Sequence, residues 1–199
     1  MFLPLFLAVL SSAEIHFLSI NWRPTHCLGI YCDDMYTQKT FINRFWQTNN
    51  DGERLDDCYG PDYEEPEFEI LEMLSAYWDI HTVNRKSSWK SEWEYDGICF
   101  NPWVPEEEYF KKAIEAFVRL DIEARMDEVG IIPNLAEKYS YYDLGNAVGN
   151  TTQVECEEVN GETYLKSFNV CYDSFMNKIK CIQDIGNCSP HFYIPPISF

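Results

Sequence analysis

Eight cysteines in a chain of 199 residues are the feature that most constrains the fold. An even number of cysteines is typical of disulfide-bonded proteins that fold in an oxidising compartment. Zinc binding is the weaker interpretation, because Cys27 and Cys32 are suitably spaced but no second pair of Cys or His repeats that spacing. Hydrophobic residues make up 46% of the chain and aromatic residues 16%, so we expect an ordered domain with a packed core.

The start of the chain predicts export. Residues 1–13, MFLPLFLAVLSSA, form an apolar run that ends in small residues, as in a secretory signal peptide. A buried N-terminal helix or strand is the alternative for this segment. A single domain would then span residues 14–199, with no other stretch long enough to cross a bilayer. Asn150 opens a glycosylation sequon, so we expect a secreted glycoprotein, with a lysosome-like compartment as the other destination.

The chain is strongly acidic, with a formal net charge of −18 at pH 7. Such a charge repels nucleic acid, so RNA is a disfavoured partner. The acids concentrate in residues 51–72, where Arg54 is the one base among ten acids. A solvated acidic loop is the simpler interpretation of this segment, and an acidic face for a basic partner is the alternative.

Helical and strand patterns alternate without a regular β–α–β rhythm, which predicts an α+β fold. Apolar residues recur at helical spacing in 105–128, where Pro105 suits the first turn and Gly130 follows the end. We expect helices at residues 67–80, 105–128 and 141–148, and strands at residues 15–22, 40–46 and 165–172.

Two segments carry a resemblance to a known family. Residues 88–99, SWKSEWEYDGIC, are similar without a gap to the F-W-x-H-E-W-x-K-H-G-T-C segment of the ribonuclease T2 family. Residues 40–47, TFINRFWQ, lie over the family's F-T-I-H-G-L-W-P segment. Residues 21–27, the Gly130–Pro133 stretch and the late cysteines follow in the family's order, so the resemblance covers nearly the whole expected domain.

The resemblance implies an antiparallel sheet packed against several helices and stabilised by disulfides. It also implies the disulfide pairing, which sequence alone leaves open. The implied pairs are Cys27–Cys32, Cys58–Cys99, Cys156–Cys188 and Cys171–Cys181. The family cleaves RNA by transphosphorylation to a 2′,3′-cyclic phosphate, with histidines as general base and acid and with no cofactor or metal.

The expected catalytic positions are degenerate in this chain. Asn43, Ser91 and Asp96 stand where the resemblance places histidines, Tyr95 stands in place of a lysine, and Glu92 is kept. Asparagine and serine cannot exchange protons near neutral pH, and an ionised Asp96 would repel a phosphate. Removing one general acid or base typically costs about 10²–10⁴-fold in rate, so we expect a pseudo-ribonuclease.

Alternative activities stay open at this point. Weak or altered RNA cleavage would have to work through Glu92. Base stacking on Trp46 is a further alternative, and a role for Trp46 in the core is the default interpretation. Glu92 and Asp96 lie four residues apart, as paired catalytic or cation-binding carboxylates would, although exposed pairs at this spacing are common on surfaces. Of the four histidines, His81 is the one whose distance from Glu92 matters most. If the chain acts by binding, its target is an unidentified protein or glycan, with no membrane partner.

Overall fold

The sheet is built around β1 (Ile15–Trp22), whose side chains are almost all buried. β1 pairs antiparallel with β2 (Thr40–Thr48) on one side and with β5 (Glu162–Tyr172) on the other. These three strands confirm the strands expected at residues 15–22, 40–46 and 165–172, and β2 and β5 extend beyond the expected ends. The computed structural model describes residues 14–28, 38–78, 85–100, 104–182 and 186–197.

Four further strands complete a sheet in the order β2-β1-β5-β7-β3, with β4 and β6 also paired to β5. They are β3 (Asn134–Ser140), β4 (Gln153–Val159), β6 (Lys178–Ile179) and β7 (His191–Ile194). The pairing is antiparallel except between β5 and β7, which run parallel where Tyr164 meets Tyr193. The α+β class is therefore confirmed, with one parallel contact in the expected antiparallel sheet.

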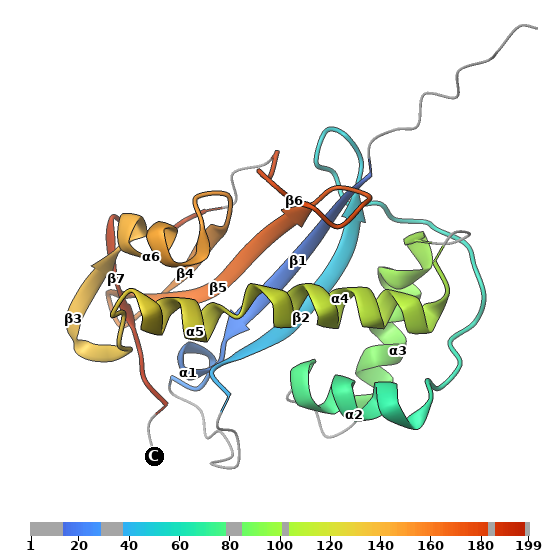
Figure 1. Cartoon of the computed structure of the whole chain (residues 1–199), viewed down its shortest axis with the longest axis horizontal. Coiled ribbons are helices and arrows are strands. Elements are labelled where there is room, and N and C mark those ends of the chain that lie inside the picture. Colours follow the sequence, from blue (N-terminus) through green and yellow to red (C-terminus); the bar gives the residue numbers. More distant parts are fainter. Residues whose placement is uncertain (1–13, 29–37, 79–84, 101–103, 183–185, 198–199) are drawn as a thin grey trace, which may run out of the picture.

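Helices pack across the sheet and at both of its ends (Figure 1). α4 and α5 follow one another across the sheet, α2 and α3 lie toward one end, and α6 lies beside β4 and β7 at the other. The helices are α1 (Arg23–His26), α2 (Phe68–Tyr77), α3 (Arg85–Tyr95), the 3-10 helix η1 (Gly97–Phe100), α4 (Glu106–Leu120), α5 (Ile122–Glu128) and α6 (Tyr141–Val148). Among the described residues, no helix has both the length and the apolar character that crossing a membrane requires.

The helix expected at residues 105–128 is two helices, so that prediction was wrong in its continuity. Asp121 adopts a left-handed conformation, with φ 41° and ψ 55°, and separates α4 from α5. This break changes which side chains face the core: Ile122 and Met126 are buried, whereas Ala124 of the expected apolar stripe is exposed.

Tyr109 is the centre of the aromatic core beneath α4. Its ring, fully buried, packs at 5.2–5.9 Å from the rings of Phe45, Trp78, Trp93 and Phe100. Its hydroxyl donates a 2.6 Å hydrogen bond to the Phe45 carbonyl on β2, which ties α4 to the sheet. A buried tyrosine hydroxyl usually has such a partner.

The disulfides implied by the resemblance are present wherever the structure describes both cysteines. Cys58–Cys99, Cys156–Cys188 and Cys171–Cys181 are bonded. Cys27 is also disulfide-bonded, and its expected partner Cys32 lies outside the described residues, as does the expected signal segment 1–13. Cys58–Cys99 matters most for the site, because it fastens the acidic loop after β2 to η1.

Gly97 lies just after α3, against the rings of Trp93 and Tyr109 in the aromatic core. The substitution Gly97→Ala should destabilise the protein. A Cβ at this position would overlap the Trp93 ring and lie 3.0 Å from two ring atoms of Tyr109. Both rings are fully buried, so overpacking should reduce the free energy of unfolding by about 1–3 kcal/mol. Urea unfolding checks this, and an unchanged midpoint and slope would show that the core has room for the methyl group.

Candidate functional site

A tight turn after β2 brings Arg54 back toward the sheet. The Asn49 side chain accepts hydrogen bonds from the backbone N–H groups of Asp51 and Glu53, and Gly52 takes a positive φ of 82°. Asparagine and glycine favour such turns because the amide caps the backbone and glycine has no Cβ. Leu55 N–H then bonds to the Gln47 carbonyl, which fixes Arg54 beside the end of β2.

The end of α3 brings two carboxylates to the same place. The Asp96 N–H donates a 2.9 Å hydrogen bond to the Glu92 carbonyl, so the two residues are one helical turn apart on one face. The Asp96 side chain is fully buried and the Glu92 side chain is 12% exposed. Unlike most carboxylate pairs at this spacing, Glu92 and Asp96 are therefore not an exposed surface pair, because α3 packs this face toward β2.

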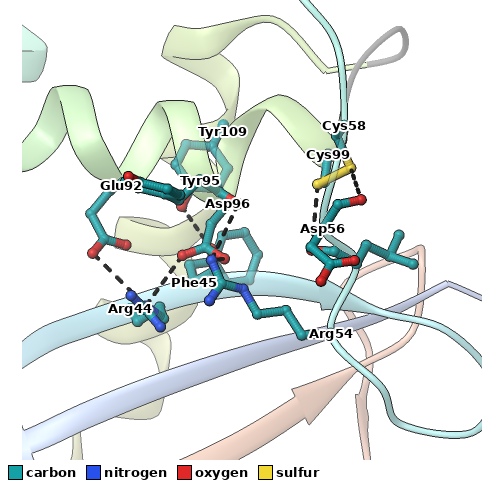
Figure 2. Close-up of polar contacts among 11 residues, drawn as sticks. Arg44, Phe45, Arg54, Asp56, Cys58, Glu92, Tyr95, Asp96, Cys99 and Tyr109 are labelled. Carbon is teal, nitrogen blue, oxygen red and sulfur yellow. Dashed lines mark hydrogen bonds and ion pairs between the residues drawn. A yellow bond between two sulfur atoms is a disulfide. The ribbon is translucent and has the colours of Figure 1, made fainter.

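Two arginines lie beside these carboxyl groups (Figure 2). Arg54 Nη2 lies 2.7 Å from Asp96 Oδ1, and Arg44 Nε lies 3.2 Å from Asp96 Oδ2 and 4.0 Å from Glu92 Oε1. Arg54 Nη2 also donates to the Tyr95 carbonyl at 3.3 Å. We call Arg44, Arg54, Glu92 and Asp96 the ion-pair cluster; it joins β2, the following loop and α3.

The two acids of the cluster differ in their environment. Burial, and secondarily the Asp96 charge, raise the pKa of Glu92 to about 8, so Glu92 is largely protonated at neutral pH. Burial also raises the pKa of Asp96, while Arg44 and Arg54 act in the opposite direction. The direct contacts to both guanidinium groups favour the ionised form of Asp96.

The other residues singled out in the sequence lie outside this cluster. Asn43 on β2 and Ser91 and Tyr95 on α3 have exposed side chains, and the Ser91 hydroxyl donates to the Ser87 carbonyl of its own helix. Trp46 stacks on Phe17 with ring centroids 4.4 Å apart, which gives one face of its indole a packing role. His81 lies outside the described residues, so its distance from Glu92 stays open.

Sequence reasoning missed both arginines of the cluster. A signal for each was present: Arg54 is the single base in the acidic segment 51–72, and Arg44 sits inside the 40–47 motif. An aspartate within a segment of buried tryptophans requires a nearby cation, because an unpaired buried charge is very costly. That requirement pointed to a basic partner, although it did not identify which one.

The sequon at Asn150 lies on the surface of the protein. Asn150 of the sequon is exposed in the turn after α6, where a glycan would meet solvent. Within the described part of the chain, no group of three or more His, Cys, Asp or Glu side chains is arranged to hold a metal ion.

Glu92→Gln should make protein stability less dependent on pH. A carboxyl whose pKa is raised by folding stabilises the folded state fully below its unfolded pKa near 4.5, and this contribution is lost as pH rises through about 8. Glutamine mimics the protonated form of Glu92. In the Glu92→Gln protein, the unfolding free energy should therefore decline less between about pH 5 and 8 than in the native protein. The difference should be about 1.4 kcal/mol for each unit by which folding raises the pKa of Glu92. Urea unfolding across this range tests it, with exposed Glu94→Gln on the same helix as the control. An equal pH slope in native and Glu92→Gln proteins would contradict the buried, protonated carboxyl.

Known proteins match this chain in sequence and in fold. The model of the ribonuclease T2 family matches residues 13–184. Ribonuclease S-2 from Pyrus pyrifolia is 24% identical over 188 residues, which cover 86% of this chain and 80% of that protein. The family match includes all four residues of the ion-pair cluster and ends before β7.

Solved structures have the same fold at lower sequence identity. The gametophytic self-incompatibility associated SF11-RNase of Nicotiana alata matches with a TM-score of 0.80 at 20% identity, over 92% of this chain and 100% of that chain. The RNase-related protein from Calystegia sepium matches with a TM-score of 0.78 at 20% identity, over 92% of this chain and 98% of that one. Because the family model matches most of its length and its fold is shared with these proteins, the chain belongs to the ribonuclease T2 family.

Proposed function

We propose that this family member does not cleave RNA and acts instead by binding a protein or glycan partner. The observation that carries the proposal is the ion-pair cluster, in which Arg44 and Arg54 close on the buried Asp96. An RNA-cleaving site needs a free proton acceptor and a free proton donor beside the phosphate. In the cluster, Asp96 is committed to two cations of its own chain.

Two departures of this sequence from the family pattern together support the proposal. Asp96 stands at a histidine position of the family pattern, and Arg44 stands at the glycine that follows the first-segment histidine position. A buried carboxylate at position 96 destabilises the fold unless cations pair with it, and Arg44 and Arg54 are those cations. We infer that the residues of the former active site now stabilise the fold.

The surface charge supports a partner other than RNA. With a net charge of −18, the protein repels a polyanion over a distance of about one Debye length, roughly 8 Å at physiological salt. The proposed setting is outside the cell, or in a lysosome-like compartment, because the bonded cysteines suit an oxidising environment. The expected signal segment and the exposed Asn150 are consistent with export.

A second candidate function rests on Glu92. A carboxyl with a pKa raised to about 8 can both donate and accept a proton near neutral pH, as a weak ribonuclease would require. In that reaction, the ribose 2′ oxygen would lose its proton and bond to phosphorus, and the departing 5′ oxygen would take up a proton. The exposed faces of Arg44 and Arg54 would contact the phosphate.

Cleavage of a fluorescent single-stranded RNA between about pH 4 and 8 distinguishes the two candidates. The native chain should give no 2′,3′-cyclic phosphate, because losing base, acid and cation together removes several orders of magnitude in rate. Product formation that disappears in the Glu92→Gln variant would contradict inactivity and establish the weak ribonuclease.

A restored variant tests whether the cluster occupies the former active site. Five substitutions are made together: Asn43→His, Arg44→Gly, Ser91→His, Tyr95→Lys and Asp96→His. Cleavage should appear in this variant and be weaker in a version that keeps Arg44, whose charge disfavours protonation of a neighbouring histidine. Circular dichroism and thermal unfolding confirm folding, and a well-folded restored variant without activity would contradict the assignment of these positions.

A further inference from the structure

A pocket of about 330 Å³ opens where α2, β2 and the junction of α4 and α5 meet. Its lining includes Gln38, Tyr77, Phe117, Val118, Asp121 and Glu123. None of these residues belongs to the ion-pair cluster. The volume is at the lower end of the range of pockets that hold small molecules.

Aromatic and aliphatic side chains make up the apolar part of the pocket lining. The rings of Tyr77 on α2 and Phe117 on α4 lie 5.7 Å apart at an interplanar angle of 51°, so they present two differently oriented surfaces. Val118 adds a half-exposed aliphatic side chain beside them. Such a lining favours a ligand with an apolar group, and the faces of aromatic rings also attract a positive charge.

The lining also includes the carboxylates of Asp121 and Glu123, and one of them is available. Glu123 Oε1 already accepts hydrogen bonds from the N–H groups of Lys39 and Thr40, at 2.8 and 3.0 Å, and its Oε2 lies 3.9 Å from Lys39 Nζ. Asp121 has an exposed side chain, and among the described residues no hydrogen bond or ion pair engages its carboxylate. Of the two carboxylates in the described lining, Asp121 is therefore the unpaired one.

We propose that this pocket binds a small organic cation with an apolar body, of the class of a protonated aryl-alkyl amine. The ammonium group would pair with Asp121, and the apolar body would lie against Tyr77 and Phe117. The composition of the pocket discriminates against anions, since its uncommitted charge is negative and the whole chain carries −18. The strongly acidic chain also raises the local concentration of cations.

Phenethylamine and 2-phenylethanol are the probes, because they share a ring and a two-carbon chain but only the amine is charged at neutral pH. Binding to the native protein is followed by calorimetry and by shifts in two-dimensional NMR spectra. The amine should bind, and the alcohol should bind at least about tenfold more weakly, as expected when an ion pair with an exposed carboxylate and a cation–π contact are both lost.

Asp121→Asn is the decisive variant, because asparagine tolerates the left-handed conformation as well as aspartate does and removes only the charge. It should weaken amine binding about tenfold. Glu128→Gln, an exposed acid on α5 outside the pocket lining, removes the same charge and should leave the affinity unchanged. Tyr77→Leu should weaken binding about threefold through loss of the ring.

Three results would overturn the proposal. They are no amine binding, equal binding of amine and alcohol, and equal effects of Asp121→Asn and Glu128→Gln. Thermal unfolding of each variant identifies any that has lost its fold, and Asp121→Asn keeps the test valid if Tyr77→Leu does not fold.

Discussion

The buried carboxylate of Asp96 is the constraint on which the arrangement of the ion-pair cluster depends. A charge without solvent contact requires partners, and Arg44 and Arg54 provide them at 3.2 and 2.7 Å. Meeting this requirement joins β2, the turn after it and the end of α3. The Cys58–Cys99 disulfide holds the same loop to η1, so covalent and ionic links reinforce one another. In this account, residues that would meet a phosphate in a ribonuclease hold the fold together instead.

The scaffold beneath the cluster depends on different contacts. Trp89 and Trp93 donate their indole N–H groups to the Trp78 and Pro61 carbonyls, and Tyr109 bonds to β2. These contacts are made by buried aromatic side chains and involve no group that a ribonuclease would use for proton transfer. Catalytic residues can therefore change while the packing of α3 against the core is retained. This separation explains how a sequence can keep the spacing of a catalytic motif together with a different set of polar residues.

Sequence reasoning predicted several elements from local patterns, missed one hairpin that a local signal indicates, and missed the features that depend on distant partners. β1 and α6 were predicted with their observed boundaries, since burial and capping act within each segment. The hairpin between β4 and β5 was missed, although Asn160-Gly161, both at positive φ, is a strong local turn signal. The ion pairs could not be assigned in advance, because Arg54 and Asp96 are far apart in sequence and meet only through the turn after β2. The break at Asp121 depends on the packing of Ile122 against the rest of the core, which no local pattern specifies.

A double-mutant cycle on Arg54 and Asp96 tests the central claim most directly. Arg54→Met leaves the buried Asp96 with one cation and should lower the unfolding free energy at neutral pH, whereas Arg119→Met, at an exposed arginine outside the cluster, should change it little. Adding Asp96→Asn to Arg54→Met should restore part of the loss, with a coupling of about 1–3 kcal/mol once the partial exposure of Arg54 is considered. If the two substitutions are instead additive, Arg54 does not stabilise the buried carboxylate, and the claim that the former active site has become a structural ion-pair cluster is wrong.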